Sequence, residues 1–86
     1  MPYINQDSRQ VYDSCADALA ERVTGIGDLN YVLTTLVLKW AERQDMSYGL
    51  LNAIIGVFEC AKLEMYRRIL TPYEERKRAE NGDVYA

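Results

Sequence analysis

Apolar residues recur at helical spacing in three stretches of the chain, and the longest runs from Ser47 to Leu70. With successive residues turned by about 100°, as in an α-helix, its large apolar side chains form one broad stripe: Leu51, Ile54, Ile55, Phe58, Met65 and Ile69. The opposite side carries what we call the small line: Gly49, Ala53, Gly56 and Cys60. Because small side chains let a second helix backbone approach closely, we predict a central helix packed from two sides.

Two earlier stretches predict two further helices. The first begins at a cap formed by Asp7 or Ser8 and ends near Gly25, since glycine favours a helix end. The second is capped by Asp28, whose charge suits the positive end of the helix dipole. After a short connection, Ser47 caps the central helix.

Pro72 is predicted to end the central helix or to kink it, because the proline ring clashes with the preceding turn. Thr71 can cap a short fourth helix that starts at Pro72 and runs to about Glu80. Gly82 follows its end, and we expect residues 83–86 to form a flexible tail. The pattern therefore predicts an all-α fold, a small helical bundle of three main helices plus a short C-terminal helix.

A single chain folded as this bundle would leave some apolar surfaces exposed. The second helix carries Tyr31 and Leu38 on the side that its main apolar stripe does not use, and the third carries the small line. A chain of 86 residues forms only a small core, and its first helix covers only one such surface. Since two-fold dimers are the commonest oligomers, we expect residues 1–86 to form one helical domain that assembles as a homodimer.

Composition and charge argue against several classes of partner. A net charge of −3 argues against binding to nucleic acid through bulk electrostatics, and the absence of histidine removes the commonest general base and metal ligand. The apolar run LLNAIIGVF is too short to span a bilayer and no charged leader precedes it, so we expect a cytoplasmic protein without membrane association. Cys15 and Cys60 stand at small, mostly apolar helical positions, where we expect buried free thiols.

Glu59, Lys62 and Tyr66 form a candidate polar cluster on the large apolar stripe of the central helix. A lysine among apolar side chains is costly unless it is paired or its ammonium group reaches water. A buried cluster of this kind would be a site with shifted pKa values. The interpretation we favour is a lysine whose stem lies along the apolar surface while its charge stays solvated.

The C-terminal part of the chain holds a run of basic residues: Arg67, Arg68, Arg76, Lys77 and Arg78. One interpretation is a basic patch for phosphate, which would allow weak binding to nucleic acid. Glutamates alternate with these cations, however, and Glu74 stands four residues before Arg78, in the favourable order for an ion pair. We therefore favour a solvated helix surface.

No motif predicts a catalytic, cofactor-binding or metal-binding residue. Helical nucleotide hydrolases hold Mg²⁺ with a dense array of carboxylates, yet Glu59 and Glu64 project about 140° apart on the helix. A phosphate-binding loop and a Ser/His or Cys/His pair are missing as well. The sequence favours a small interaction protein that self-associates and could also bind an unknown protein partner. The alternatives are a nucleotide-hydrolase-like enzyme with metal-binding carboxylates and a weak nucleic-acid binder that uses the C-terminal basic residues.

Separated motifs along the chain resemble a known family. They are MPYI at the start, GDLNYV at 27–32, IGVFECAKLEMYRR at 55–68 and PYEERKRAENGDVY at 72–85. The family resembled consists of small uncharacterised proteins of bacteria, archaea and phages, described as a domain of unknown function. The resemblance spans nearly the whole chain and implies a stand-alone unit, but it implies no activity, substrate or cofactor.

Overall fold

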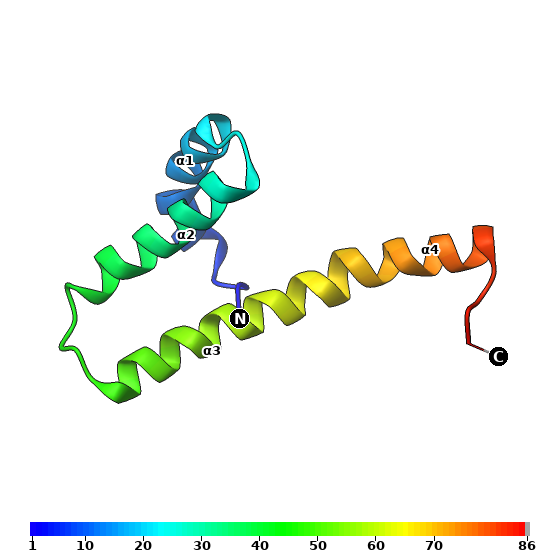
Figure 1. Ribbon diagram of the computed structural model, residues 1–86. Helices are drawn as coiled ribbons and strands as arrows, with labels where there is room; N and C mark the ends of the chain where they lie inside the picture. The colour runs from blue at the N-terminus through cyan, green and yellow to red at the C-terminus, as the bar shows by residue number, and fades with distance from the viewer. Residues whose placement is uncertain (86) are drawn as a thin grey trace. The chain divides into compact units, whose positions relative to one another are not determined.

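A computed structural model describes residues 1–85, and every regular element among them is a helix. In chain order the elements are α1 (Gln6–Arg22), α2 (Ile26–Ala41), α3 (Tyr48–Met65), the π-helical turn η1 (Tyr66–Leu70) and α4 (Thr71–Asn81) (Figure 1). The predicted all-α class is confirmed. Contacts divide the chain into an N-terminal unit, residues 2–54, and a C-terminal unit, residues 55–85 with Met1.

The start of α1 differs from the sequence prediction. Asn5 is the N-cap, and its Oδ1 accepts a hydrogen bond of 2.9 Å from the backbone N–H of Ser8. Asp7 and Ser8, the predicted caps, both lie inside the first turn. The predicted cap was two or three residues too late, because asparagine can satisfy an unpaired N–H of the first turn and comes earlier in the chain.

The start of α2 also lies earlier than predicted. Gly25, in extended conformation, precedes the helix, so Asp28 belongs to the first turn and is not the cap. Thr24 Oγ1 donates a hydrogen bond of 2.9 Å to the Asp28 carboxylate, which bridges the residues before the helix to its first turn. The carboxylate still lies at the positive end of the helix dipole, which is the electrostatic effect that the sequence predicted.

The start of α3 agrees with the sequence. Ser47 Oγ accepts a hydrogen bond of 3.0 Å from the backbone N–H of Leu50, and Ser47 C=O accepts one of 3.1 Å from Leu51. This is the geometry of an N-cap, in which a side-chain oxygen satisfies an N–H that has no partner in the first turn. Ser47 therefore fixes where the central helix begins.

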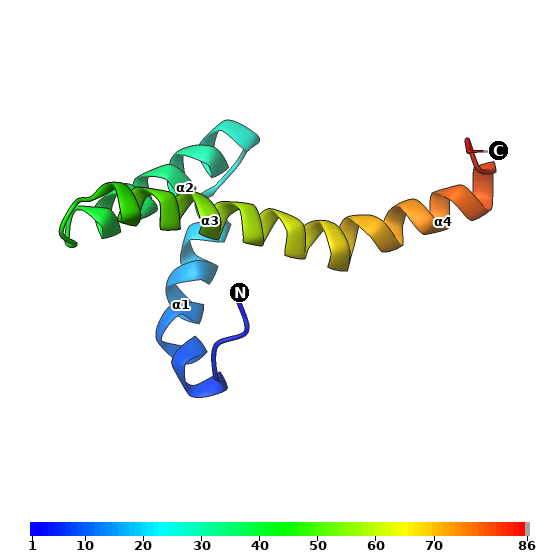
Figure 2. The same cartoon turned by 90° about the horizontal axis from the view of Figure 1, so that it is seen from below.

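Pro72 neither ends the central helix nor starts an independent one. Residues of α3, η1 and α4 follow one another in helical conformation without a break (Figures 1 and 2). Thr71, the predicted cap, has helical φ and ψ of −58° and −50°, and its N–H bonds to the carbonyl of Tyr66, five residues back. A π-helical turn widens the backbone ahead of the proline ring, which relieves the clash that the prediction assumed would break the helix.

The end of α4 agrees with the prediction. Gly82 follows Asn81 with a φ of 92°, a backbone conformation that residues with a Cβ rarely adopt. Its N–H bonds to the carbonyl of Arg78 at 2.9 Å, which satisfies one of the last carbonyls of the helix. Residues 83–85 of the predicted tail follow outside the helix, and Ala86 lies outside the described residues.

Among residues 1–85, only Ala41 is buried, with 2% of its surface exposed. Within the N-terminal unit, no two of the described helices pack along their length. As described, the C-terminal unit consists of Met1, one helical segment from Ile55 to Asn81 and residues 82–85 after it. Each unit, taken by itself, therefore leaves its apolar side chains uncovered.

We predict that Ser47→Ala lowers the free energy of unfolding by about 1 kcal/mol, because the N–H of Leu50 loses its acceptor. Ser47→Asp restores an acceptor and should recover most of that loss. Urea denaturation followed by circular dichroism measures the change, with Ser14→Ala on α1 as a control for serine removal elsewhere. A Ser47→Ala variant as stable as the parent would contradict the cap.

Candidate interaction surface

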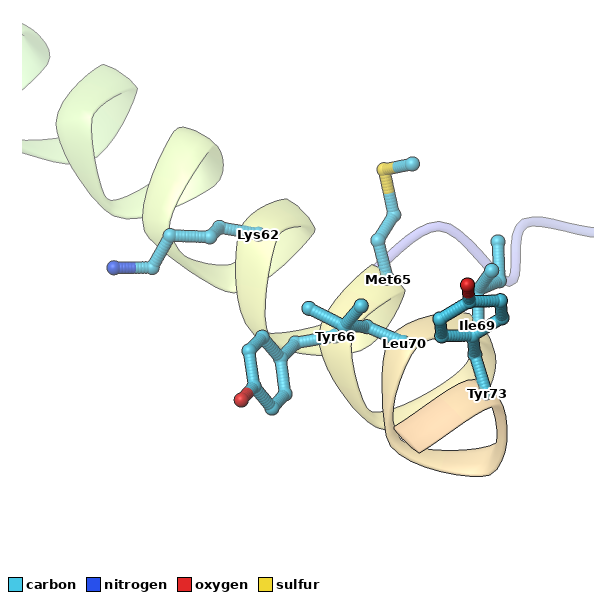
Figure 3. A pocket seen from close by; sticks show the side chains of 6 residues that line it. All are labelled: Lys62, Met65, Tyr66, Ile69, Leu70 and Tyr73. Atoms are coloured by element: carbon cyan, nitrogen blue, oxygen red, sulfur yellow. The ribbon is translucent and has the colours of Figure 1, made fainter. Parts of the chain in front are cut away.

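A shallow apolar hollow of about 610 Å³ lies on the C-terminal unit (Figure 3). Six side chains from η1 and the helical turns on either side of it line the hollow: Lys62, Met65, Tyr66, Ile69, Leu70 and Tyr73. In Figure 3 the ammonium group of Lys62 points away from the apolar side chains. The hollow is therefore an apolar surface with one cation at its end.

The π-helical turn explains why so many apolar residues share this hollow. In an uninterrupted α-helix, Met65 and Leu70 would project about 140° apart. The wider turn between Tyr66 and Leu70 brings residues five positions apart closer to the same side. As a result, Leu70 joins Met65 and Tyr66 in lining the hollow.

The predicted polar cluster is present as an exposed ion pair. Lys62 Nζ lies 2.9 Å from Glu59 Oε1, and the two side chains are 66% and 54% exposed. Tyr66 lies on the neighbouring turn and lines the hollow beside Lys62. Because both charged groups are in contact with solvent, the geometry is that of a surface pair and not of a buried acid–base site.

Most of the predicted basic residues have acidic partners on the same helix. Arg67 Nη2 lies 2.9 and 2.8 Å from the two oxygens of Glu64, and Lys77 pairs with Glu80 at 3.2 Å. Arg78 pairs with Glu75. The predicted Glu74–Arg78 pair is therefore wrong, because the arginine reaches the carboxylate three residues back instead of four.

Two cations of α4, one of them also paired with Glu80, lie over the ring of Tyr73. The guanidinium of Arg76 and the ammonium of Lys77 each lie 5.8 Å from the centre of its ring. This distance is within the range of cation–π attraction. Tyr73 therefore connects the apolar hollow to the charged part of the helix. Arg68, the fifth predicted basic residue, lies in η1 and is exposed.

The small line of α3 is open within the chain. A Cβ added at Gly56 would meet nothing within 4 Å, and one added at Gly49 would meet only Ser47 Oγ, at 3.8 Å. Cys60 is a free thiol, as is Cys15, but both are exposed, so the prediction that they are buried was wrong. The packing that would bury them is not provided by either unit alone. Ala53 is exposed like the rest of the line.

The second uncovered surface predicted from the sequence lies on α2. Tyr31 and Leu38 are both exposed there. Their side chains lie in the N-terminal unit, where no described helix packs along α2.

The described residues lack the features of two further classes of site. No group of three or more carboxylate or thiol side chains gathers in residues 1–85 where a metal ion could be held. No helix in that part of the chain has the length and apolar content needed to cross a membrane.

The sequence analysis did not predict that the six residues of the hollow form one surface. It placed Met65 and Ile69 on the apolar stripe but assigned Tyr73 to a separate helix beyond Pro72. A signal was available, since Lys62, Tyr66, Ile69 and Tyr73 follow one another at spacings of four, three and four residues. That spacing crosses Pro72 without interruption and so indicated a continuous helix.

Comparison with known proteins places the chain in a family. A family model described as "Domain of unknown function (DUF6899)" matches residues 1–84. The chain therefore belongs to the DUF6899 family, in agreement with the resemblance to a domain of unknown function. No curated protein and no solved structure matches it significantly.

We predict that Lys62→Met changes the free energy of unfolding by less than about 1 kcal/mol, because an exposed ion pair contributes little and methionine keeps the apolar stem. Chemical denaturation measures the effect. A much larger loss that Glu59→Gln restores would show instead that the two groups form a buried pair in the assembled protein.

We predict that removing residues 83–86 leaves the helices folded. Val84 and Tyr85 are almost fully exposed, and Asp83 approaches Arg78 only at 3.8 Å. At matched oligomeric state, the melting temperature should fall by less than about 4 °C, the equivalent of 1 kcal/mol or less. The dissociation constant for self-association should rise several-fold. A large drop in melting temperature would place the tail in the core.

Proposed function

We propose that this member of the DUF6899 family is a self-associating interaction protein that completes its hydrophobic core as a homodimer. In this proposal a second copy of the chain covers the apolar surfaces that each unit leaves open. The result is a dimeric helical bundle in which helices of both copies share one core.

One observation carries the proposal: in the described part of the C-terminal unit, one helical segment is the only regular element, and no second helix of that unit covers it. Ile55, Met65 and Ile69 each expose more than 60% of their surface there. An isolated helix is marginal in water, and most helix stability in proteins comes from packing of an apolar face. Burying apolar surface contributes roughly 25 cal/mol per Å², which gives these side chains a strong drive toward a second surface.

The N-terminal unit supports the same conclusion. Tyr31 and Leu38 lie exposed on α2, and Ala41 is the one buried residue among those described. The small line of α3 has room for the backbone of another helix, since Gly56 has no neighbour within 4 Å of a Cβ position. A second copy is the simplest source of such a helix, because two-fold symmetry presents the same uncovered surfaces twice.

We predict that light scattering gives twice the chain mass at micromolar concentration. Leu38→Glu should shift the protein toward the monomer, because a carboxylate at a covered apolar position is costly. Leu38→Met, which keeps the position apolar, is the matched control.

Gly56 supplies a second pair of variants for the same measurement. In the single chain a Cβ at this position meets nothing, so Gly56→Leu should not weaken an isolated helix and should even favour it by roughly 0.8 kcal/mol. In a dimer the leucine side chain separates two closely packed helices, so Gly56→Leu should dissociate the protein more than Gly56→Ala does. A parent protein that is monomeric, with variants that behave like it, would refute the dimer; a larger complex with a different protein would point to a foreign partner.

A further inference from the structure

We infer that the apolar hollow of the C-terminal unit is the site where the same segment of a second copy docks, antiparallel to the first. The two-fold axis passes between Arg67 and Arg68. This inference rests on the proposed homodimer, but it specifies the segment, its direction and its register, which the proposal leaves open.

The first argument is the symmetry of the hollow itself. The six lining residues are placed symmetrically about the midpoint between Arg67 and Arg68. In an antiparallel pair around that point, Tyr66 faces Ile69 of the second copy, Met65 faces Leu70, and Lys62 faces Tyr73. A two-fold interface requires this reciprocity, in which residue i contacts residue j and residue j contacts residue i. The two inner pairings then join apolar side chains, and in the outer pairing the ring of Tyr73 meets the stem of Lys62.

The second argument is the charge next to the hollow. One turn further out, the same symmetry places Glu59 opposite Arg76 of the second copy. Glu59 binds Lys62 through Oε1, so its Oε2 can pair with a second cation. Arg76 forms no ion pair among those observed and stacks on Tyr73 at 5.8 Å, so its guanidinium is positioned beside the hollow. Two such Glu59–Arg76 pairs, one at each end, border the apolar contact.

The third argument is that a parallel pair would bring like charges together and would separate Glu59 from Arg76. A parallel two-fold pair would place Lys62 beside Lys62 and Arg76 beside Arg76, and like charges in contact are destabilising. It would also separate Glu59 of one copy from Arg76 of the other by the length of 17 residues, about 25 Å in a helix. The charges of this segment therefore favour the antiparallel pair.

The small line does not compete with this contact. It occupies residues 49–60 on the side of α3 away from the large apolar stripe, whereas the hollow spans residues 62–73. One dimer can therefore cover the hollow with the same segment of the second copy and the small line with another of its helices.

Disulfide trapping tests the direction and register. In a Cys15→Ser, Cys60→Ser background, one chain carries Lys62→Cys and a second carries Tyr73→Cys. The two positions lie about 16 Å apart along a helix, so the two directions give different products. With oxidised glutathione as the oxidant, the antiparallel pair predicts covalent dimers when the two chains are mixed and few when either is alone. Covalent dimers from each chain alone would overturn the antiparallel arrangement.

Charge reversal provides a second measurement. Glu59→Arg and Arg76→Glu should each raise the dimer dissociation constant about tenfold, since two attractive pairs become repulsive. The double variant should restore the parent value, whereas Glu21→Arg on α1 should leave it unchanged. Helicity measured by circular dichroism excludes unfolding as the cause.

The combined outcomes separate the two proposals. If light scattering finds a monomer, both the homodimer and its register fail. If it finds a dimer that forms no Lys62→Cys to Tyr73→Cys cross-link and does not respond to charge reversal, only the register fails.

Discussion

The need to bury the apolar side of one long helical segment governs this structure. From Tyr48 to Asn81 the chain is helical throughout, and the described part of its C-terminal unit contains no second element to cover that side. Helix propensity alone does not sustain such a segment in water; packing does. Two ion pairs along it, Glu59–Lys62 and Glu75–Arg78, are exposed, and each contributes at most about 1 kcal/mol. In a third pair, Glu64–Arg67, the arginine is exposed and the glutamate is partly buried. Stability must therefore come from apolar contacts beyond the unit.

The backbone around Pro72 keeps the apolar side of this segment continuous. A proline within a helix usually breaks it, and a break here would have divided the apolar surface into two short pieces. The π-helical turn before it keeps the segment continuous and moves Leu70 toward Met65. The irregular turn thus lies within the apolar surface that it enlarges, in keeping with the frequent occurrence of π-bulges at functional positions.

Sequence reasoning succeeded where structure is local and failed where it depends on what lies across space. The Ser47 cap and the Gly82 terminus follow from chemistry within a few residues, and both were predicted. The Asn5 cap was missed because several capping residues compete within one turn, and the Glu74–Arg78 pair because side chains at three and four residues are nearly equivalent. The hollow was missed because Pro72 was expected to end or kink the helix, although the regular apolar spacing continued beyond it. The burial of Cys15 and Cys60 is a tertiary property, and the residues that would cover them are not determined by the helix that carries them.

Gly56 gives a further reason to expect assembly. Glycine inside a helix costs roughly 0.8–1 kcal/mol relative to alanine, and here it has no compensating role within the chain. Its φ is not positive, and a Cβ would meet no atom within 4 Å. In the proposed homodimer, a close neighbour from the second copy would supply the missing reason, since it would make the absence of a side chain favourable. That proposal gives the exposed Tyr31 and Leu38, the open small line and the symmetric hollow one common explanation, in which residues that destabilise the single chain would stabilise the pair.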